Sequence, residues 1–272
     1  MSVLMLAAIA VAILPLGFIL ADVAIKGVSQ LSLSFFTKPE PFLVTATGGG
    51  FGAGIRGTVK MVALVSAVSV PIGILAAVYL TEYRGRTPLA ALVRFFADVM
   101  TGIPSIFVGI FVFTVVVLVT HSFSTWSGGL ALGILMLPVI VRTSEEALRL
   151  VPQTQREAAH ALGVAQWRIV ASVVVPAALP GLTTGVLLAV ARAAGETAPL
   201  LLTAFGNQLL VGWSKWSGPE ASLTLQLFFD SRSPFAAQQA RAWTGAVVLI
   251  LGILILSLAA RVIVRRRSSG AG

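Results

Sequence analysis

Long runs of apolar residues, each about the length of a membrane span, constrain the fold of this chain most strongly. Six such runs lie at roughly 3–25, 58–80, 98–120, 128–148, 178–204 and 243–264. A helix that crosses a bilayer needs about 20 mainly apolar residues, and in lipid a helix satisfies its backbone polar groups internally. The runs therefore predict an all-α, polytopic membrane protein with about six transmembrane helices.

The low charge content excludes a water-soluble fold of this size. Only 11% of the 272 residues are charged, and the mean hydropathy is +0.97, whereas soluble domains carry about 25% charged residues. The first run is longer than the apolar part of a signal peptide, about 7–15 residues, and no Lys or Arg precedes it. We therefore expect residues 1–26 to be a retained transmembrane helix.

The basic residues indicate the orientation in the membrane. The net charge is +9, which in a soluble protein would indicate nucleic acid. Here eleven basic residues lie in the segments 81–94 and 142–177 and in the C-terminal region, and seven lie in the longer segments that alternate with them. Positive charge gathers on the cytoplasmic side. We expect both termini to be cytoplasmic in a bacterial inner membrane, with no nucleic-acid partner.

The chain offers few groups for catalysis or metal binding. It has no cysteine, which excludes disulfides, thiolate zinc sites and cysteine nucleophiles. Its two histidines, His121 and His160, lie far apart in the predicted topology. We expect no catalytic residues, no metal site, no cofactor and no enzymatic activity in this chain.

A glycine-rich sequence before the second apolar run has the form of a nucleotide-binding motif. Residues Gly52 to Gly57 match G-x-G-x-x-G, but a dinucleotide site needs a preceding strand and a soluble βαβ unit. No Gly-Lys-Ser or Gly-Lys-Thr occurs in the chain. Any use of ATP is therefore expected to depend on another chain.

After the first helix at 1–26, composition divides the sequence into three further parts. Residues 27–57 are rich in Pro, Thr and Gly and are expected to form a flexible external connector after the first helix. Residues 58–264 form the predicted core, which contains a cytoplasmic segment at 145–177. Residues 265–272 are expected to form a basic cytoplasmic tail.

The most informative segment lies within 145–177 and reads Glu-Ala-Ala-His-Ala-Leu-Gly at 157–163. Its first six residues favour a helix, and Gly163 suits the position that ends one. Alanines give such a helix a smooth surface that fits a groove on another protein, and Glu157 adds a charged anchor. The segment therefore predicts a short cytoplasmic docking helix.

This segment resembles the EAA loop of bacterial ABC importer permeases. That loop reads Glu-Ala-Ala, three residues, Gly, nine residues, Ile, one residue and Leu-Pro. Four residues match at the same spacing: Glu157, Ala158, Ala159 and Gly163. Val173 and Val175-Pro176 replace Ile and Leu-Pro. The resemblance implies that residues 157–163 couple the chain to a separate ATPase subunit.

Further segments resemble the A-type permease of phosphate-specific transport (Pst) systems, the PstA type within the MetI-like superfamily. They are 100–106, 137–148, 191–200 and 222–228, and the resemblance extends from Gly49 to Arg261. It implies a type I ABC importer permease fold and one half of the translocation pathway of an ATP-driven phosphate importer. The implied partners are a homologous permease (PstC-like), two ATPase subunits (PstB-like) and an external phosphate-binding protein (PstS-like).

Two charges in the fifth apolar run are the candidate pathway residues. Arg192 and Glu196 are four residues apart and would share one helix face. A charge inside a membrane costs at least a few kcal/mol unless it is paired or faces water, and an Arg guanidinium suits phosphate oxygens. The pair either lines the substrate pathway or joins two helices. Glu145 and Arg149 are expected to form a surface pair, and Asp98 to be solvated.

Three other functions remain open from the residues alone. One is a permease for another oxyanion, such as sulfate or molybdate. Another is an ion-gradient-driven secondary transporter, which would carry its own intramembrane carboxylates and an internal repeat. The third is a membrane scaffold or sensor without transport activity, which would not purify with an ATPase.

Overall fold

The computed structural model of the protein describes residues 2–83 and 87–269. Two isolated bridges, Ser124 with Ser217 and Phe205 with Glu220, are the only β-type pairs in these ranges. The α-helices are α1 Ser2–Gly27, α2 Leu33–Thr37, α3 Gly52–Val78, α4 Pro88–Gly102, α5 Ser105–Val112, α6 Leu118–Thr120, α7 Thr125–Arg149, α8 Gln153–Ala161, α9 Gln166–Ile169, α10 Val175–Gly195, α11 Ala198–Thr203, α12 Leu223–Ser231 and α13 Ala236–Ser269. A 3₁₀ turn, η1 Val28–Gln30, follows α1. Three π-helical turns, η2 Tyr79–Tyr83, η3 Phe113–Val117 and η4 Val170–Val174, continue neighbouring helices.

Five stretches of the described chain are long and apolar enough to cross a membrane: Leu4–Gln30, Gly52–Tyr83, Thr125–Arg149, Gln166–Gly195 and Ala236–Val262. A sixth is a bent pair, Pro88–Gly102 with Ser105–Thr120, whose two arms differ in direction by 106°. With that pair included, the count agrees with the predicted six. The chain is therefore a multi-pass membrane protein.

The bent pair corrects the expectation of one continuous helix over 98–120. Pro104 has no N–H to donate and its ring restricts the residue before it to extended backbone. Ile103 accordingly has φ −76° and ψ 129°, and the helix that starts at Pro88 ends at Gly102. The fifth run, expected at 178–204, is also divided, because α10 ends at Gly195 and Glu196 is extended.

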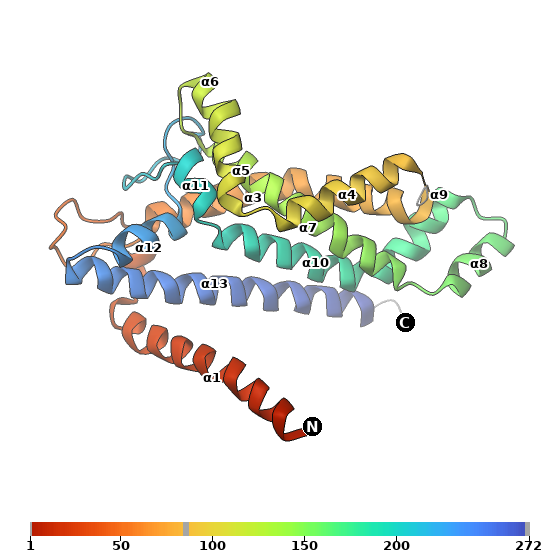
Figure 1. Ribbon diagram of the computed structural model, residues 1–272, viewed down its shortest axis with the longest axis horizontal. Coiled ribbons are helices and arrows are strands. Elements are labelled where there is room, and N and C mark those ends of the chain that lie inside the picture. The colour runs from red at the N-terminus through yellow and green to blue at the C-terminus, as the bar shows by residue number, and fades with distance from the viewer. Residues whose placement is uncertain (1, 84–86, 270–272) are drawn as a thin grey trace.

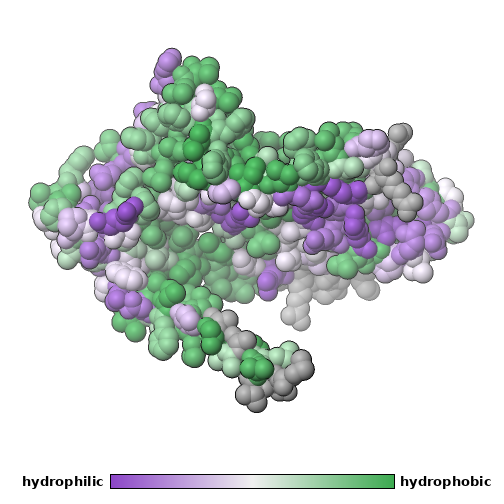
Figure 2. All heavy atoms as spheres, viewed as in Figure 1, coloured by the Kyte–Doolittle hydropathy of each residue, from purple (hydrophilic) through white to green (hydrophobic). Residues whose placement is uncertain are grey.

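The long helices α3, α7, α10 and α13 lie side by side along the molecule, with α8 at one end of the bundle (Figure 1). Helices α5 and α6 rise away from the bundle. Helix α1 contacts α13 at its C-terminal end, and its N-terminal end points away from the bundle (Figure 1). The central core joins α3, α7 and α10 through Met61, Leu132, Met136, Ile140 and Ala189. Apolar atoms cover α1 and α5–α6, whereas hydrophilic atoms gather at the α8 end (Figure 2). This pattern is that of helices facing lipid or another apolar surface.

The glycines of the G-x-G-x-x-G sequence serve close packing at the start of α3. A Cβ added to Gly57 would lie 2.0 Å from the carbonyl oxygen of Ala221, and one added to Gly54 would lie 2.1 Å from Oε1 of Gln226. The Gly54 N–H also donates to that oxygen over 2.8 Å. These contacts hold the segment 221–226 directly against α3.

Replacing Gly57 by alanine is expected to destabilise the protein by about 1–3 kcal/mol, because overpacking shifts backbone. Gly252 provides the matched control, since a Cβ there meets no atom within 4 Å, and Gly252→Ala is expected to leave stability unchanged or slightly raised. Thermal unfolding of both purified variants in detergent checks this. Equal melting temperatures would contradict the packing role of Gly57.

The connector at 27–57 is packed against the bundle, contrary to the expectation of a flexible segment. Phe35 and Phe51 are buried with Leu223 and Val248, and their rings lie 5.3 Å apart. The aromatic side chains supply enough apolar area to fix a segment whose Gly and Pro content alone indicates mobility. At the other end of the chain, α13 continues past the predicted boundary at 264 to Ser269, and the rest of the predicted tail lies outside the described residues.

Candidate functional site

Helix α8 carries the predicted docking segment and projects from the end of the bundle (Figure 1). It starts at Gln153, earlier than the 157 predicted from sequence, and none of its residues is buried. Gly163 has φ +72°, and its N–H donates to the carbonyl of His160 over 2.9 Å. A left-handed glycine with this bond ends the helix and turns the chain toward α9.

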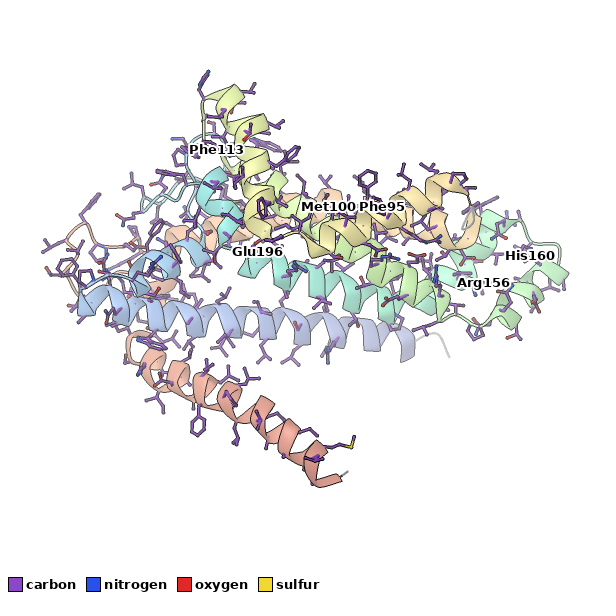
Figure 3. All side chains as sticks on the ribbon, in the orientation of Figure 1. Phe95, Met100, Phe113, Arg156, His160 and Glu196 are labelled. Carbon is purple, nitrogen blue, oxygen red and sulfur yellow. The ribbon has the colours of Figure 1, made fainter. Side chains whose placement is uncertain are left out.

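The four residues of the Glu-Ala-Ala…Gly pattern are divided between two faces of this segment. Glu157, Ala158 and Gly163 are exposed, whereas Ala159 packs against the apolar cluster beneath α8 that includes Leu148, a residue of α7. Figure 3 shows His160 at the outer end of the helix and Arg156 nearer the bundle. The structure therefore places Glu157 and Ala158 on a surface open to another protein.

The predicted pathway residues, Arg192 and Glu196, meet at the junction between α10 and α11 (Figure 3 labels Glu196). Arg192 Nε lies 3.6 Å from Glu196 Oε1, with the side chains 44% and 16% exposed. Glu196 directly follows the last residue of α10, Gly195, and has extended backbone. The two therefore meet across a helix end, not along one helix face as their spacing predicted.

The contacts of this pair leave the guanidinium open to an anion. A separation of 3.6 Å is longer than a normal hydrogen bond, and nearly half of the Arg192 side chain is exposed. Glu196 is held in place because its carbonyl oxygen accepts a 2.8 Å bond from Thr224 Oγ1 on α12. The site thus combines a fixed backbone at Glu196 with an Arg192 guanidinium that has donors to offer.

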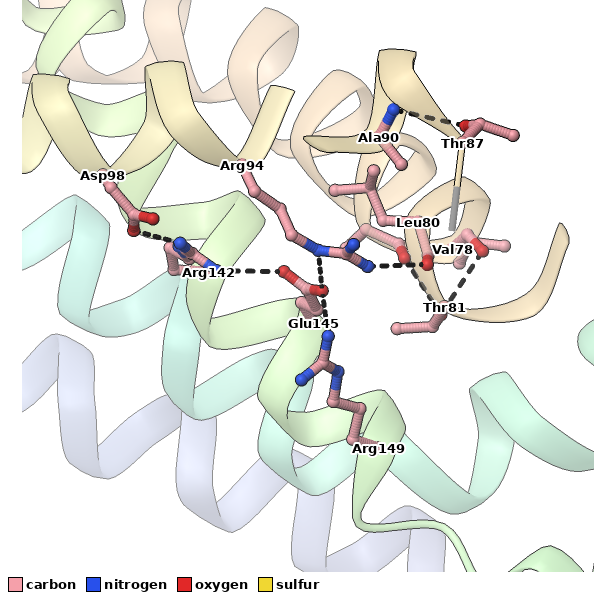
Figure 4. Close-up of polar contacts among 11 residues, drawn as sticks. Val78, Leu80, Thr81, Thr87, Ala90, Arg94, Asp98, Arg142, Glu145 and Arg149 are labelled. Atoms are coloured by element: carbon pink, nitrogen blue, oxygen red, sulfur yellow. Dashed lines mark hydrogen bonds and ion pairs between the residues drawn. The ribbon is translucent and has the colours of Figure 1, made fainter. Parts of the chain in front are cut away.

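Glu145 is buried in an arginine network, which corrects the expectation of a surface pair with Arg149 (Figure 4). Its side chain is 2% exposed and accepts from Arg149 over 2.6 Å, Arg94 over 2.7 Å and Arg142 over 3.4 Å. Arg142 also pairs with Asp98, which is exposed as expected. The network fastens α4 to α7. Sequence spacing missed it because Arg94 lies 51 residues from Glu145.

Two further buried ion pairs were not found from the sequence. Lys60 of α3 pairs with Glu220, and both side chains are at most 3% exposed; Thr125 of α7 donates to the same carboxylate over 2.9 Å. Arg241 pairs with Asp230 with similar burial. The only local signal for Lys60 is that it is a charged residue near the start of the apolar run at 58–80.

Glu40 of the connector is buried beside the ion pair between Asp230 and Arg241. Burial, and after it the Asp230 carboxylate, raise the pKa of the Glu40 carboxyl to about 7, while Arg241, Gln226 and Gln208 partly oppose this shift. Burial also raises the pKa of Asp230. Because Glu40 binds its proton more tightly in the folded protein than in the unfolded chain, low pH stabilises the folded state.

The stability of the protein is therefore expected to fall between pH 4.5 and about pH 7 as Glu40 loses its proton, by up to about 3 kcal/mol. Glu40→Gln keeps the side chain neutral, so the variant is expected to lose less stability than the wild type over this range. Thermal unfolding in detergent at pH 5 and pH 8 measures the difference. The control is Asp22→Asn, which changes an exposed carboxylate. The same pH dependence in Glu40→Gln and the wild type would contradict the role of Glu40.

A bundle of five to six spanning helices that presents a short exposed helix at one end, with a charged pair at a broken helix, is the architecture of a multi-pass transport permease. The profile of the family described as binding-protein-dependent transport system inner membrane components matches residues 69–269. The PstA phosphate transport system permease of Yersinia pestis is 41% identical over 251 residues, covering 92% of this chain and 84% of that protein. The PstA protein of Xylella fastidiosa strain 9a5c is 42% identical over 246 residues, covering 89% of this chain and 83% of that protein. The chain belongs to the binding-protein-dependent transport permease family and, within it, to the PstA phosphate transport permeases.

Solved structures agree on the fold. A chain of the MetNI methionine ABC transporter in an inward-facing conformation has a TM-score of 0.63 at 21% identity, covering 78% of this chain and 94% of that one. A chain of an amino acid ABC transporter has a TM-score of 0.57 at 18% identity, covering 79% and 93%. The prediction of an all-α permease with the MetI-like fold of ABC importers is confirmed. The family does not favour the secondary transporter, the scaffold or a permease for another oxyanion.

Proposed function

We propose that this chain is the permease subunit of an ATP-driven phosphate importer, that it forms half of the translocation pathway, and that a partner chain hydrolyses the ATP. The observation that carries the coupling role is α8, which bears the Glu157-Ala158-Ala159…Gly163 pattern and buries none of its residues. An isolated helix of this length is marginal in water. A groove on an ATPase subunit would supply its missing contacts.

The proposed complex pairs this chain with a homologous PstC-like permease. Two PstB-like ATPases contact the cytoplasmic side, and a PstS-like binding protein delivers phosphate from outside. The start of α1 and the end of α13 lie toward the α8 end of the bundle (Figure 1). If α8 contacts the ATPase in the cytoplasm, both termini lie on the cytoplasmic side of the inner membrane.

Arg192 and Glu196 are the proposed pathway residues. A guanidinium presents several N–H donors in a planar fork, which suits phosphate oxygens. Glu196 keeps Arg192 oriented while no anion is present, and a phosphate would compete with this weak contact. The substrate then passes a cavity between the two permeases.

Movement in the proposed cycle starts at the ATPases. Their closure on ATP shifts α8, and the permease changes between states open to opposite sides of the membrane. ATP can drive this exchange only through its different affinity for the two states. No bond in the transported phosphate is made or broken.

Purification in mild detergent followed by reconstitution tests this function. We expect the chain to purify with an ATPase whose activity rises with phosphate-loaded binding protein, and vesicles of the complex to take up labelled phosphate. Excess unlabelled phosphate is expected to block uptake, and sulfate or molybdate to have little effect. Competition by sulfate as strong as by phosphate, or uptake without ATP, would contradict the proposal.

A further inference from the structure

Arg156 ties α8 to the rest of the bundle. Its Nη2 lies 2.9 Å from Oε1 of Glu82 and its Nε lies 3.3 Å from Oε2, so that the guanidinium and carboxylate meet through two parallel bonds. The two side chains are 13% and 4% exposed. Two-pronged, charge-assisted bonds of this kind fix orientation as well as distance. The first turns of α8 are therefore held rigidly to Glu82.

The remaining donors of Arg156 cap another helix. Nη2 donates to the carbonyl of Leu148 over 2.8 Å, and Nη1 donates to the carbonyl of Val151. These carbonyls belong to the last turn of α7 and the residues just after it, where a helix leaves its final carbonyls without internal partners. Arg156 thus joins α8 to α7 as well as to Glu82.

Glu82 receives contacts from both arms of the segment that contains α8. It lies in the π-helical turn η2 that ends α3, and its carbonyl oxygen accepts from Gln166 Nε2 of α9 over 3.3 Å. A second π-helical turn, η4, leads from α9 into α10. Short π-helical turns of this kind are frequent at functional sites.

The space around this link allows α8 to shift. A cavity of about 590 Å³ is lined by Glu82, Arg94, Arg149, Arg156 and His160, among others, from α8 and the neighbouring elements. Close apolar packing resists movement, but on α8 it involves Ala159 alone, and at the cavity the helix is held by the directional polar bonds of Arg156. Displacement of α8 therefore acts on Glu82.

Helix α3 extends from Glu82 to the opposite end of the bundle. There Lys60 pairs with Glu220, and Thr58 Oγ1 accepts from the N–H of Leu223 over 2.9 Å. Leu223 opens α12, which also holds Glu196 through Thr224. A contiguous series of bonded elements thus runs from α8, through α3, to the proposed pathway pair.

We infer that the Arg156–Glu82 ion pair is the link that transmits movement of α8 to α3, so that both are positioning residues for transport. This inference rests on the proposed coupling of α8 to an ATPase. Movement of α8 could instead reach the bundle through the chain segment that joins α8 to α7, and Glu82 would then have no role in transmission. Only the proposed link makes coupling depend on the carboxylate of Glu82.

The test uses the complete complex in vesicles, with Glu82→Gln and Arg156→Gln. We expect both variants to assemble and to keep basal ATPase activity. Stimulation by phosphate-loaded binding protein and phosphate uptake per ATP should each fall by at least about fivefold, the lower end of measured coupling factors. The control, Asp22→Asn, removes an ion pair whose side chains are both nearly half exposed, and should behave as wild type. Stimulation and uptake equal to wild type in Glu82→Gln would overturn the inference.

A covalent replacement separates transmission from simple stability. Because the chain has no cysteine, the double variant Glu82→Cys/Arg156→Cys can be joined by a thiol-specific cross-linker. We expect coupling to be low before cross-linking and to recover afterwards. Assembled complexes in which cross-linking leaves stimulation low would overturn the inference. If the glutamine variants fail to assemble, Arg156→Lys takes their place as the test, because lysine keeps the charge but not the two-pronged contact. Stimulation equal to wild type in Arg156→Lys would also overturn the inference. A wild-type complex without ATP-driven uptake would instead contradict the proposed function itself.

Discussion

Replacing Glu157 by lysine is expected to abolish ATP-driven phosphate uptake while the chain still inserts and folds. Glu157 is exposed on α8, and substitutions at such positions usually change stability by no more than about 0.5 kcal/mol. In a groove on the ATPase, however, the reversed charge would face groups arranged for a carboxylate, and a like-charge contact there costs several kcal/mol. Uptake by reconstituted vesicles at saturating ATP measures the effect.

Gln155 offers a matched control for this charge change. Gln155 is also exposed on α8. Because it lies two residues before Glu157 on the helix, it faces a different direction. Gln155→Lys is expected to retain most of the uptake. Intact uptake in Glu157→Lys, or equal loss in both variants, would show that Glu157 has no specific role in coupling.

Replacing Arg192 by glutamine is expected to lower phosphate uptake by about 10- to 100-fold, because a charge-assisted bond to phosphate is worth about 1.5–3 kcal/mol. Arg192→Lys should be intermediate, since lysine keeps the charge but not the planar fork. Initial uptake rates against external phosphate concentration measure the loss in assembled complexes. Arg232→Gln is the control, because Arg232 is another exposed arginine, at the end of α12.

Glu196 distinguishes a pathway role from a structural one. In the pathway account Glu196→Gln is milder than Arg192→Gln, because the guanidinium remains available to phosphate. A purely structural ion pair would make the two single variants equally harmful, because each leaves one charge without its partner, and replacing both residues by methionine would restore function, because no unpaired charge remains. Uptake by the double variant at the wild-type rate would therefore exclude Arg192 as a phosphate ligand.

The sequence predicted those features that depend on residues close together in the chain. The apolar runs located the spans because hydropathy acts over about 20 neighbouring residues. Gly163 marked the end of α8 because a left-handed turn there favours glycine. Arg192 and Glu196 meet as their short separation predicted, although across a helix end.

Contacts between distant residues left no comparable pattern. Glu82 and Arg156 are 74 residues apart, and Lys60 and Glu220 are 160 apart. Nothing in either local sequence distinguishes a buried partner from a solvated charge, because burial is set by how the helices pack. Glu145 shows the consequence: its spacing to Arg149 was correct, and its burial was not.

Local breaks were also underestimated, for a different reason. The sequence predicted one helix over 98–120, yet Pro104 together with Ile103 divides this apolar run into two helices. Hydropathy is insensitive to such a break, since both arms remain apolar. The connector was misjudged in the opposite sense, because two buried rings, Phe35 and Phe51, outweigh its many turn-forming residues.

The central claim is that α8 meets an ATPase on the cytoplasmic side of the membrane. Leu162, at the end of α8, is 83% exposed, and Leu162→Cys would be the only cysteine in the chain. Its reaction with a membrane-impermeant thiol reagent is the most direct measurement. The account predicts labelling in inside-out vesicles stripped of the ATPase, protection when the ATPase is restored, and none in intact spheroplasts. Labelling in spheroplasts would place α8 outside the cell and contradict the account.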